Sequence, residues 1–162
     1  MILSISGTPG TGKTFLAKKL MKELNYPLLD VKKFIKEKKL SEGHDKKRNT
    51  DIIDIKKLNK ELIKEIKKVQ KENSPEGIII DSHLSHYLPK KQIDLVIITK
   101  CNLKILEKRL KSRKYSKLKI RENLDAEIFD TCYTEAKELG HKVIKVDTTK
   151  GINIKQIIKK LK

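Results

Sequence analysis

Short apolar runs alternate along the chain with longer segments in which apolar residues recur every three or four positions. Uninterrupted apolar runs are typical of strands buried on both faces of a parallel sheet, whereas the longer pattern is typical of amphipathic helices. Strands are expected at residues 2–5, 26–30, 77–81, 94–99 and 142–146. Because these strands alternate with helices, the pattern predicts a doubly wound α/β fold, in which helices cover both faces of a five-stranded parallel sheet.

Several residues mark where the helices begin and end. Asn102 is a good N-cap, and Ser116 is expected to cap a longer helix that runs to about Leu139 and stops at Gly140. Residues 41–50 have the composition of turns and no hydrophobic period, so this segment is predicted to be a mobile loop. The predicted helices cover about residues 15–24, 31–40, 52–69, 103–111, 116–139 and 154–161.

The composition limits the class of protein. A chain of 162 residues fits one domain with a substantial core. Lysine and arginine number 39 against 21 acidic residues, and residues 100–122 alone carry ten basic and two acidic side chains. Such a field attracts polyanions, which include nucleotides, RNA and a ribosomal surface. A solvated lysine-rich surface, as in heat-adapted proteins, is the other interpretation, and the two are compatible.

The cysteines and the hydropathy pattern indicate the compartment. Cys101 and Cys132 have no metal-ligand spacing and are typical of reduced thiols in a cytosolic protein. No apolar run approaches the ~20 residues needed to span a bilayer, and the first strand begins without a preceding signal peptide. We therefore expect a cytoplasmic protein with no membrane contact.

A glycine-rich motif connects the first strand to the first helix, and it reads Gly7-Thr8-Pro9-Gly10-Thr11-Gly12-Lys13-Thr14. This is a complete G-x-x-x-x-G-K-T, in the strand–loop–helix context that a phosphate-binding P-loop requires. The glycines allow successive backbone N–H groups to face one phosphate at the positive end of a helix. Lys13 would reach the β- and γ-phosphates of ATP, and the Thr14 hydroxyl would ligate Mg²⁺.

Two other classes of P-loop protein fit less well. A GTPase should carry Asp-x-x-Gly after the third strand, but Asp81 is followed by Ser82-His83-Leu84. The segment Thr99-Lys100-Cys101-Asn102 resembles a guanine-binding Asn-Lys-x-Asp, yet Asn102 lacks the required carboxylate and is explained as a helix cap. The serine-glycine signature of a transporter-type ATPase is absent from the sequence.

A nucleoside monophosphate kinase needs an arginine-bearing lid after the fourth strand. Arg109 and Arg113 lie four residues apart on one helix face at that position, and the next helix opens at about Ser116, so the lid is short. Arginine suits this role because it stacks on bases and binds phosphates with two donors. The alternative is that both arginines belong to the general basic surface.

Five segments together suggest a family: the P-loop, Gly43-His44-Asp45, Asp81-Ser82-His83, Arg109-Leu-Lys-Ser-Arg113-Lys-Tyr-Ser and Asn123-Leu-Asp-Ala-Glu-Ile-Phe129. With these segments the chain resembles, over nearly its whole length, the adenylate kinase isoenzyme 6 family. These are archaeal and nuclear P-loop kinases tied to small ribosomal subunit assembly. The resemblance implies a single nucleoside monophosphate kinase domain over residues 1–162. Its monophosphate-binding region would cover about residues 31–55 and its lid about residues 109–118.

The resemblance also implies the activity and the roles of individual residues. The reaction would be Mg²⁺-dependent phosphoryl transfer from ATP to AMP, with ATP hydrolysis as a second activity. Lys13, Asp81, His83 and Arg113 would be catalytic: Asp81 would hold Mg²⁺ through water, and His83 would orient the attacking water. The remaining contacts would come from Arg109 stacking on adenine, Thr148 and Thr149 bordering it, and Lys36, His44 and Asp45 on the AMP side.

A second interpretation uses the same site with a different outcome. The protein would be an assembly factor that hydrolyses ATP as a switch and has little kinase activity. Its partners would then be a small-subunit ribosomal protein and ribosomal RNA, which the basic region around the lid could face. The two interpretations differ in the phosphoryl acceptor, AMP or water.

Overall fold

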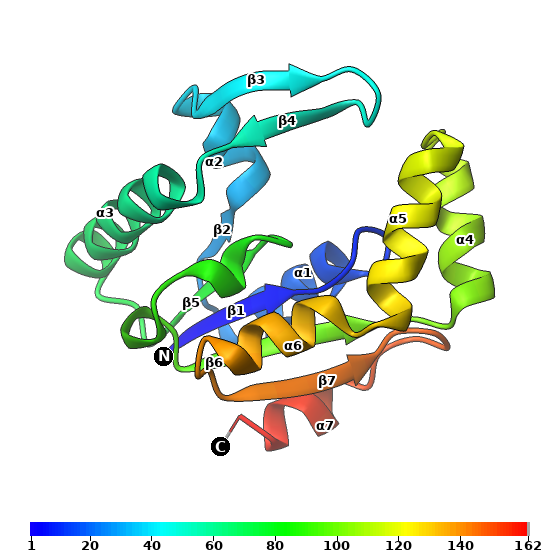
Figure 1. Cartoon of the computed structure of the whole chain (residues 1–162). Helices are drawn as coiled ribbons and strands as arrows, with labels where there is room; N and C mark the ends of the chain where they lie inside the picture. The colour runs from blue at the N-terminus through cyan, green and yellow to red at the C-terminus, as the bar shows by residue number, and fades with distance from the viewer. Residues whose placement is uncertain (162) are drawn as a thin grey trace.

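The computed structural model of the chain describes residues 1–161. Its centre is a five-stranded sheet in which every neighbouring pair of strands is parallel, with the order β2-β5-β1-β6-β7 (Figure 1). The predicted α/β class and five-stranded parallel sheet are therefore confirmed. The strands of the sheet are β1 (Ile2–Ser6), β2 (Leu28–Asp30), β5 (Ile78–Asp81), β6 (Leu95–Lys100) and β7 (Val143–Asp147).

Helices pack on both faces of this sheet. One face is covered by α1 (Lys13–Leu24) and α7 (Ile154–Lys159), and the other by α3 (Ile55–Asn73) and α6 (Thr131–Glu138) (Figure 1). The remaining elements are α2 (Val31–Glu37), β3 (Ser41–Asp45), β4 (Thr50–Ile53), α4 (Leu103–Ser112), α5 (Lys117–Ile128) and two short 3₁₀ turns, η1 (Ser85–Tyr87) and η2 (Lys90–Gln92).

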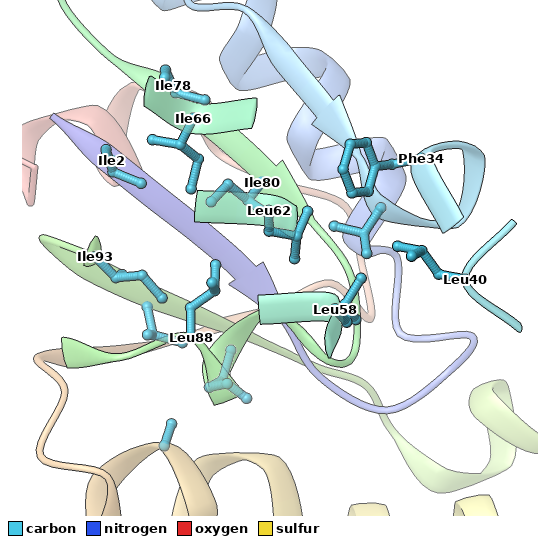
Figure 2. Packing of buried hydrophobic residues seen from close by; sticks show 14 residues of the cluster. Ile2, Phe34, Leu40, Leu58, Leu62, Ile66, Ile78, Ile80, Leu88 and Ile93 are labelled. Atoms are coloured by element: carbon cyan, nitrogen blue, oxygen red, sulfur yellow. The ribbon is translucent and has the colours of Figure 1, made fainter. Parts of the chain in front are cut away.

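Alternation within the strands divides the core in two. In β1, Leu3 and Ile5 face α1, whereas Ile2 belongs to the cluster under α3. Figure 2 shows this second cluster, in which Leu62 of α3 and Phe34 of α2 pack near the β5 side chains. Strand residues are therefore apolar on both faces, which is why the apolar runs carried a strong signal in the sequence. No described helix is both long and apolar enough to cross a membrane.

The prediction of a mobile loop at residues 41–50 was wrong. The segment contributes to an antiparallel hairpin of β3 and β4, which extends beyond the main sheet towards α5 (Figure 1). Its turn is closed by Asp45, whose carboxylate accepts hydrogen bonds from the backbone N–H groups of Lys47 and Arg48 at 2.9 and 3.1 Å. Because most hairpin side chains are exposed on both faces, the sequence has no apolar alternation there.

The single long helix predicted from Ser116 is in fact two helices. The Ser116 cap is present, because its hydroxyl accepts from the Lys119 N–H at 3.2 Å. The chain breaks at Asp130, which has a left-handed φ of 54°, and α6 then runs on its own. Ion pairs from Lys100 and Lys145 to the two Asp130 carboxylate oxygens, each at 2.8 Å, hold this break in place.

Helices α4 and α5 form an arm with a core of its own. Buried Leu106, Leu110 and Ile120 pack with Tyr115 and Leu124 in a cluster distinct from the two cores of the sheet. We call residues 103–128 the α4–α5 arm. The predicted cap of α4 is confirmed, since the Asn102 side chain accepts from the Lys104 N–H at 3.0 Å.

Candidate active site

The P-loop lies at the carboxyl end of β1, where an open α/β sheet places its ligands. Gly7, Gly10 and Gly12 all have positive φ, and a side chain at Gly10 would come within 2.8 Å of Leu106 in α4. Pro9 and Thr11 complete the loop, and the Thr11 hydroxyl is buried against the Thr8 carbonyl at 2.7 Å. The glycines thus give the curvature that the motif predicted, and Gly10 also allows the arm to pack closely.

Lys13 opens α1 and folds back onto its own loop. Its ammonium group donates to the carbonyl oxygens of Gly7 and Thr8 at 2.8 and 3.0 Å. Burial lowers the pKa of Lys13 to about 8, and the negative charge of Asp81 opposes that shift. A phosphate in the loop would offer this ammonium group stronger acceptors than the two carbonyls.

Asp81 ends β5 beside the start of α1. Only 7% of the residue is exposed, and burial raises the pKa of its carboxyl above the ordinary value, while the Thr14 hydroxyl and Lys13 act in the opposite direction. Asp30 stands next to it in the register of β2 and β5. A carboxylate and a hydroxyl side by side are the hard oxygen donors that Mg²⁺ prefers, so Thr14 and Asp81 fit this ion.

His83 lies two residues beyond Asp81 with its side chain exposed. Desolvation by the surrounding protein, followed by the charge of Lys13, lowers the pKa of the ring to about 4. A ring with this lowered pKa is neutral at pH 7, so one ring nitrogen is free to accept a proton from water.

The two arginines of the arm differ in their contacts with the P-loop. The Arg109 guanidinium donates to the Gly10 carbonyl at 3.2 Å and to the Thr148 carbonyl at 3.4 Å. Arg113, at the C-cap of α4, is exposed, and its charge contributes to lowering the pKa of Lys13. The structure therefore brings Arg109 to the P-loop and to the loop after β7.

The loop after β7 closes the other side of the P-loop. Thr148 is buried, and its hydroxyl donates to the Lys100 carbonyl at 3.0 Å, while a side chain at Gly12 would lie 3.3 Å from it. Thr149 accepts from the Asn102 N–H at 2.9 Å. A cavity of about 500 Å³ adjoins this loop, lined by Lys100, Cys101, Asn102, Lys145, Asp147 and Thr149.

The three residues expected on the AMP side lie apart from this cluster. Lys36 is exposed in the last turn of α2, and its side chain makes no hydrogen bond or ion pair with any residue that the structure describes. His44 bonds within the hairpin to Asp51 and Asn49, at 3.1 and 3.0 Å. Asp45 is occupied by the hairpin turn, and Arg48 holds its pKa below the ordinary value.

Sequence reasoning assigned no role to two residues that connect parts of the site. Glu127 of α5 is buried, and its carboxylate accepts from the P-loop hydroxyl of Thr8 at 2.7 Å. Arg48 spans from the hairpin to α5 and donates to both carboxylate oxygens of Glu122, at distances from 2.7 to 3.0 Å. Only the match of residues 123–129 to the family pattern pointed towards Glu127.

Comparisons with known proteins show the family to which the chain belongs. Residues 3–130 match a family model described as an AAA domain. A protein named "Putative adenylate kinase" from Thermococcus onnurineus is 39% identical over 150 residues, which is 92% of this chain and 76% of that protein. An "Adenylate kinase isoenzyme 6 homolog" from Caenorhabditis elegans is 32% identical over 134 residues, which is 83% of this chain and 71% of that one. The chain belongs to the adenylate kinase isoenzyme 6 family.

Solved structures show the same fold at lower sequence identity. A deoxyadenosine kinase from M. mycoides has a TM-score of 0.57 and 18% identity, with 99% of this chain and 98% of that chain covered. The YorR protein of Bacillus subtilis has a TM-score of 0.59 and 17% identity, with 99% and 93% covered. This adenylate kinase isoenzyme 6 family member is thus built on a fold that other P-loop proteins share.

Proposed function

We propose that the protein is an adenylate kinase that transfers the γ-phosphoryl group of Mg²⁺-bound ATP to AMP. The observation that carries this proposal is that Lys13 and Thr14 at the start of α1 lie beside Asp81 at the end of β5, at the P-loop end of the sheet. The family of the chain and the adenylate kinase names of its relatives support it. Residues 1–162 would form one kinase domain, with a lid at about residues 109–118 and a monophosphate-binding region at about residues 31–55.

The chemistry requires positioning and charge neutralisation more than covalent participation by the protein. Lys13 and Arg113 would stabilise the charge on the γ-phosphoryl group during in-line attack by an AMP oxygen. The AMP phosphate is already ionised, so no general base is needed. Mg²⁺, held at Thr14 and through water at Asp81, would neutralise further phosphate charge when bound. Arg109, Thr148 and Thr149 would border the adenine of ATP.

The hairpin and α2 carry the residues proposed to bind AMP, the phosphoryl acceptor. These residues are Lys36, His44 and Asp45. Arg48 connects the hairpin to α5 through an ion pair with Glu122. We expect Arg48→Ala to raise the KM for AMP roughly fivefold, because the hairpin then loses its ion pair with α5. Arg121→Ala, which breaks an exposed pair with Asp125 within α5, is the matched control and should leave this KM unchanged. Equal effects of the two variants would contradict a role for the hairpin contact.

A second candidate activity is hydrolysis of ATP, which the exposed and neutral His83 beside the P-loop favours. We expect His83→Ala to lower ATP hydrolysis by about tenfold or more. A positioned general base typically accelerates a reaction by about 10²- to 10⁴-fold. Transfer to AMP should fall less than threefold, roughly, since that reaction needs no activated water. Phosphate release and ADP formation are measured separately, and parallel losses would reject this division of roles.

A role in small ribosomal subunit maturation would use the same site as a switch. The net charge of +18 favours a ribosomal RNA surface or a complex that contains a small-subunit ribosomal protein. Sedimentation with small subunits at rising salt tests this, because phosphate contacts weaken steeply as salt increases. Absence of binding at low salt would remove the assembly role and leave a metabolic kinase in the cytoplasm.

The decisive experiment on the activity is nucleotide turnover followed by chromatography. Mg²⁺ and ATP are supplied alone and then with AMP, GMP, CMP or UMP. Rapid ADP formation that depends on AMP establishes the adenylate kinase. Slow release of ADP and phosphate, independent of any monophosphate, would instead establish an ATPase.

A further inference from the structure

Glu127 joins three segments at the base of the α4–α5 arm. One carboxylate oxygen accepts from the Thr8 hydroxyl at 2.7 Å, and the other accepts from the Cys101 N–H at 2.9 Å. Thr8 lies in the P-loop, and Cys101 lies just before α4. Glu127 itself lies near the end of α5, so the chain entering the arm and the chain leaving it both meet this one side chain.

The α4–α5 arm has the features of a rigid unit that can pivot where it joins the sheet. Its buried residues form a cluster of their own, and the helical chain is interrupted at each end of it. Residues 101–102 precede it, and Phe129 and left-handed Asp130 follow it. The arm also brings Arg109 to the P-loop, where its guanidinium donates to the Gly10 carbonyl at 3.2 Å. A change in its angle would therefore act on Glu127 directly.

Thr8 transmits that position to the phosphate-binding loop. Its carbonyl oxygen accepts from the Lys13 ammonium group at 3.0 Å, from the Thr11 N–H at 3.2 Å and from the Thr11 hydroxyl at 2.7 Å. The side chain of Thr8, only 3% exposed, has its hydrogen bond to Glu127. Thr8 thus contacts Lys13 through its backbone carbonyl and Glu127 of the arm through its hydroxyl.

The charge of Glu127 is balanced locally. Its carboxylate lies 3.1 Å from the Lys100 ammonium group, which also donates to the Glu127 backbone carbonyl at 2.8 Å. A buried carboxylate without a partner is strongly disfavoured, and an unbalanced one near a triphosphate would also repel it. The positive charge of Lys100 offsets the negative charge of Glu127. The Glu127 carboxylate can therefore lie next to an anion-binding loop and accept hydrogen bonds from Thr8 and Cys101.

We propose that Glu127 is a positioning residue, which holds Thr8 and thereby sets the P-loop for ATP according to the position of the α4–α5 arm. The proposal rests on the proposed function only in that the P-loop binds ATP. It does not require that AMP be the acceptor. The Glu127 carboxylate contacts Thr8, Cys101 and Lys100, so its effect on ATP would pass through Thr8.

The test compares variants of Thr8 and Glu127 by calorimetric titration with Mg²⁺ and ATP. Thr8→Val keeps the shape of the side chain and removes its hydroxyl, so ATP binding should weaken about tenfold, the usual scale for a hydrogen bond to a charged group. Thr8→Ser keeps the hydroxyl and should therefore retain much more ATP affinity than Thr8→Val. Ser4→Ala removes another buried β1 hydroxyl, bonded to Ser85 at 2.8 Å, and should not change ATP affinity.

Glu127→Ala tests whether the Thr8 effect passes through the carboxylate. In that background, adding Thr8→Val should cause no further loss of ATP affinity, because the bond it removes is already gone. Glu127→Gln, which keeps the size of the side chain, serves the same purpose if the alanine variant does not fold. Equal losses from Thr8→Val in both backgrounds, or a loss in Ser4→Ala as large as in Thr8→Val, would overturn the proposal. Normal ATP binding without AMP-dependent turnover would instead count against the adenylate kinase alone.

Discussion

Replacing Lys13 by alanine is expected to lower both transfer to AMP and hydrolysis of ATP by about a thousandfold or more. Lys13 is proposed to supply the ammonium group that meets the phosphates. In the structure this group donates to the carbonyls of Gly7 and Thr8, and it forms no ion pair with any residue that the structure describes. Its loss would remove charge stabilisation from the transition states of both proposed reactions.

Chromatographic turnover measures this loss, and Lys22→Ala is the matched control. Lys22 is exposed in the last turn of the same helix, so its removal should leave both activities intact. The Lys13 variant should remain folded, because burial already disfavours its charged form and lowers its pKa to about 8. A Lys13→Ala protein that retains more than roughly a tenth of its activity would contradict the role of the P-loop.

The parts of the site that sequence reasoning found are those that depend on consecutive residues. The P-loop needs glycines at set spacings between a strand and a helix, and Gly7, Gly10 and Gly12 adopt the positive φ that this requires. Asp81 was expected at the site from the family resemblance, and the structure places it at the end of β5, next to β1 in the parallel sheet. Local chemistry was sufficient for the P-loop, whereas Asp81 needed the resemblance.

The parts that sequence reasoning missed depend on contacts between distant segments. Nothing local at Asp130 ends a helix; the break is held by lysines from β6 and β7. The hairpin has few buried side chains and is closed by Asp45 and by Arg48 reaching Glu122, 74 residues away. Glu127 meets Thr8 across 119 residues. Such pairs have no periodicity along the chain, so hydrophobic patterning could not reveal them.

Replacing Asp81 by asparagine is expected to remove activity while stabilising the free protein. Transfer should fall by about 10²- to 10³-fold, because the carboxylate proposed to hold Mg²⁺ becomes a neutral amide. Burial raises the pKa of this carboxyl in the folded protein. At neutral pH the ionised carboxylate therefore destabilises the fold relative to the unfolded chain, and this cost is relieved only as the pH falls and the group is protonated. Asparagine resembles the protonated form at every pH.

We therefore expect Asp81→Asn to raise the melting temperature at pH 7 by about 2–4 °C, the shift that about 1 kcal/mol produces in a domain of this size. The gain should shrink as the pH is lowered through the raised pKa of Asp81, since the unaltered protein then loses its charge as well. Asp94→Asn is the control, because the Asp94 carboxylate accepts from the Ile2 N–H at 2.6 Å at the far end of the sheet and should show neither effect. A lower melting temperature for Asp81→Asn would mean that Thr14 and Lys13 outweigh burial at this carboxylate. A gain in stability with lost activity would show that the site keeps a buried charge for its chemistry at the expense of the fold.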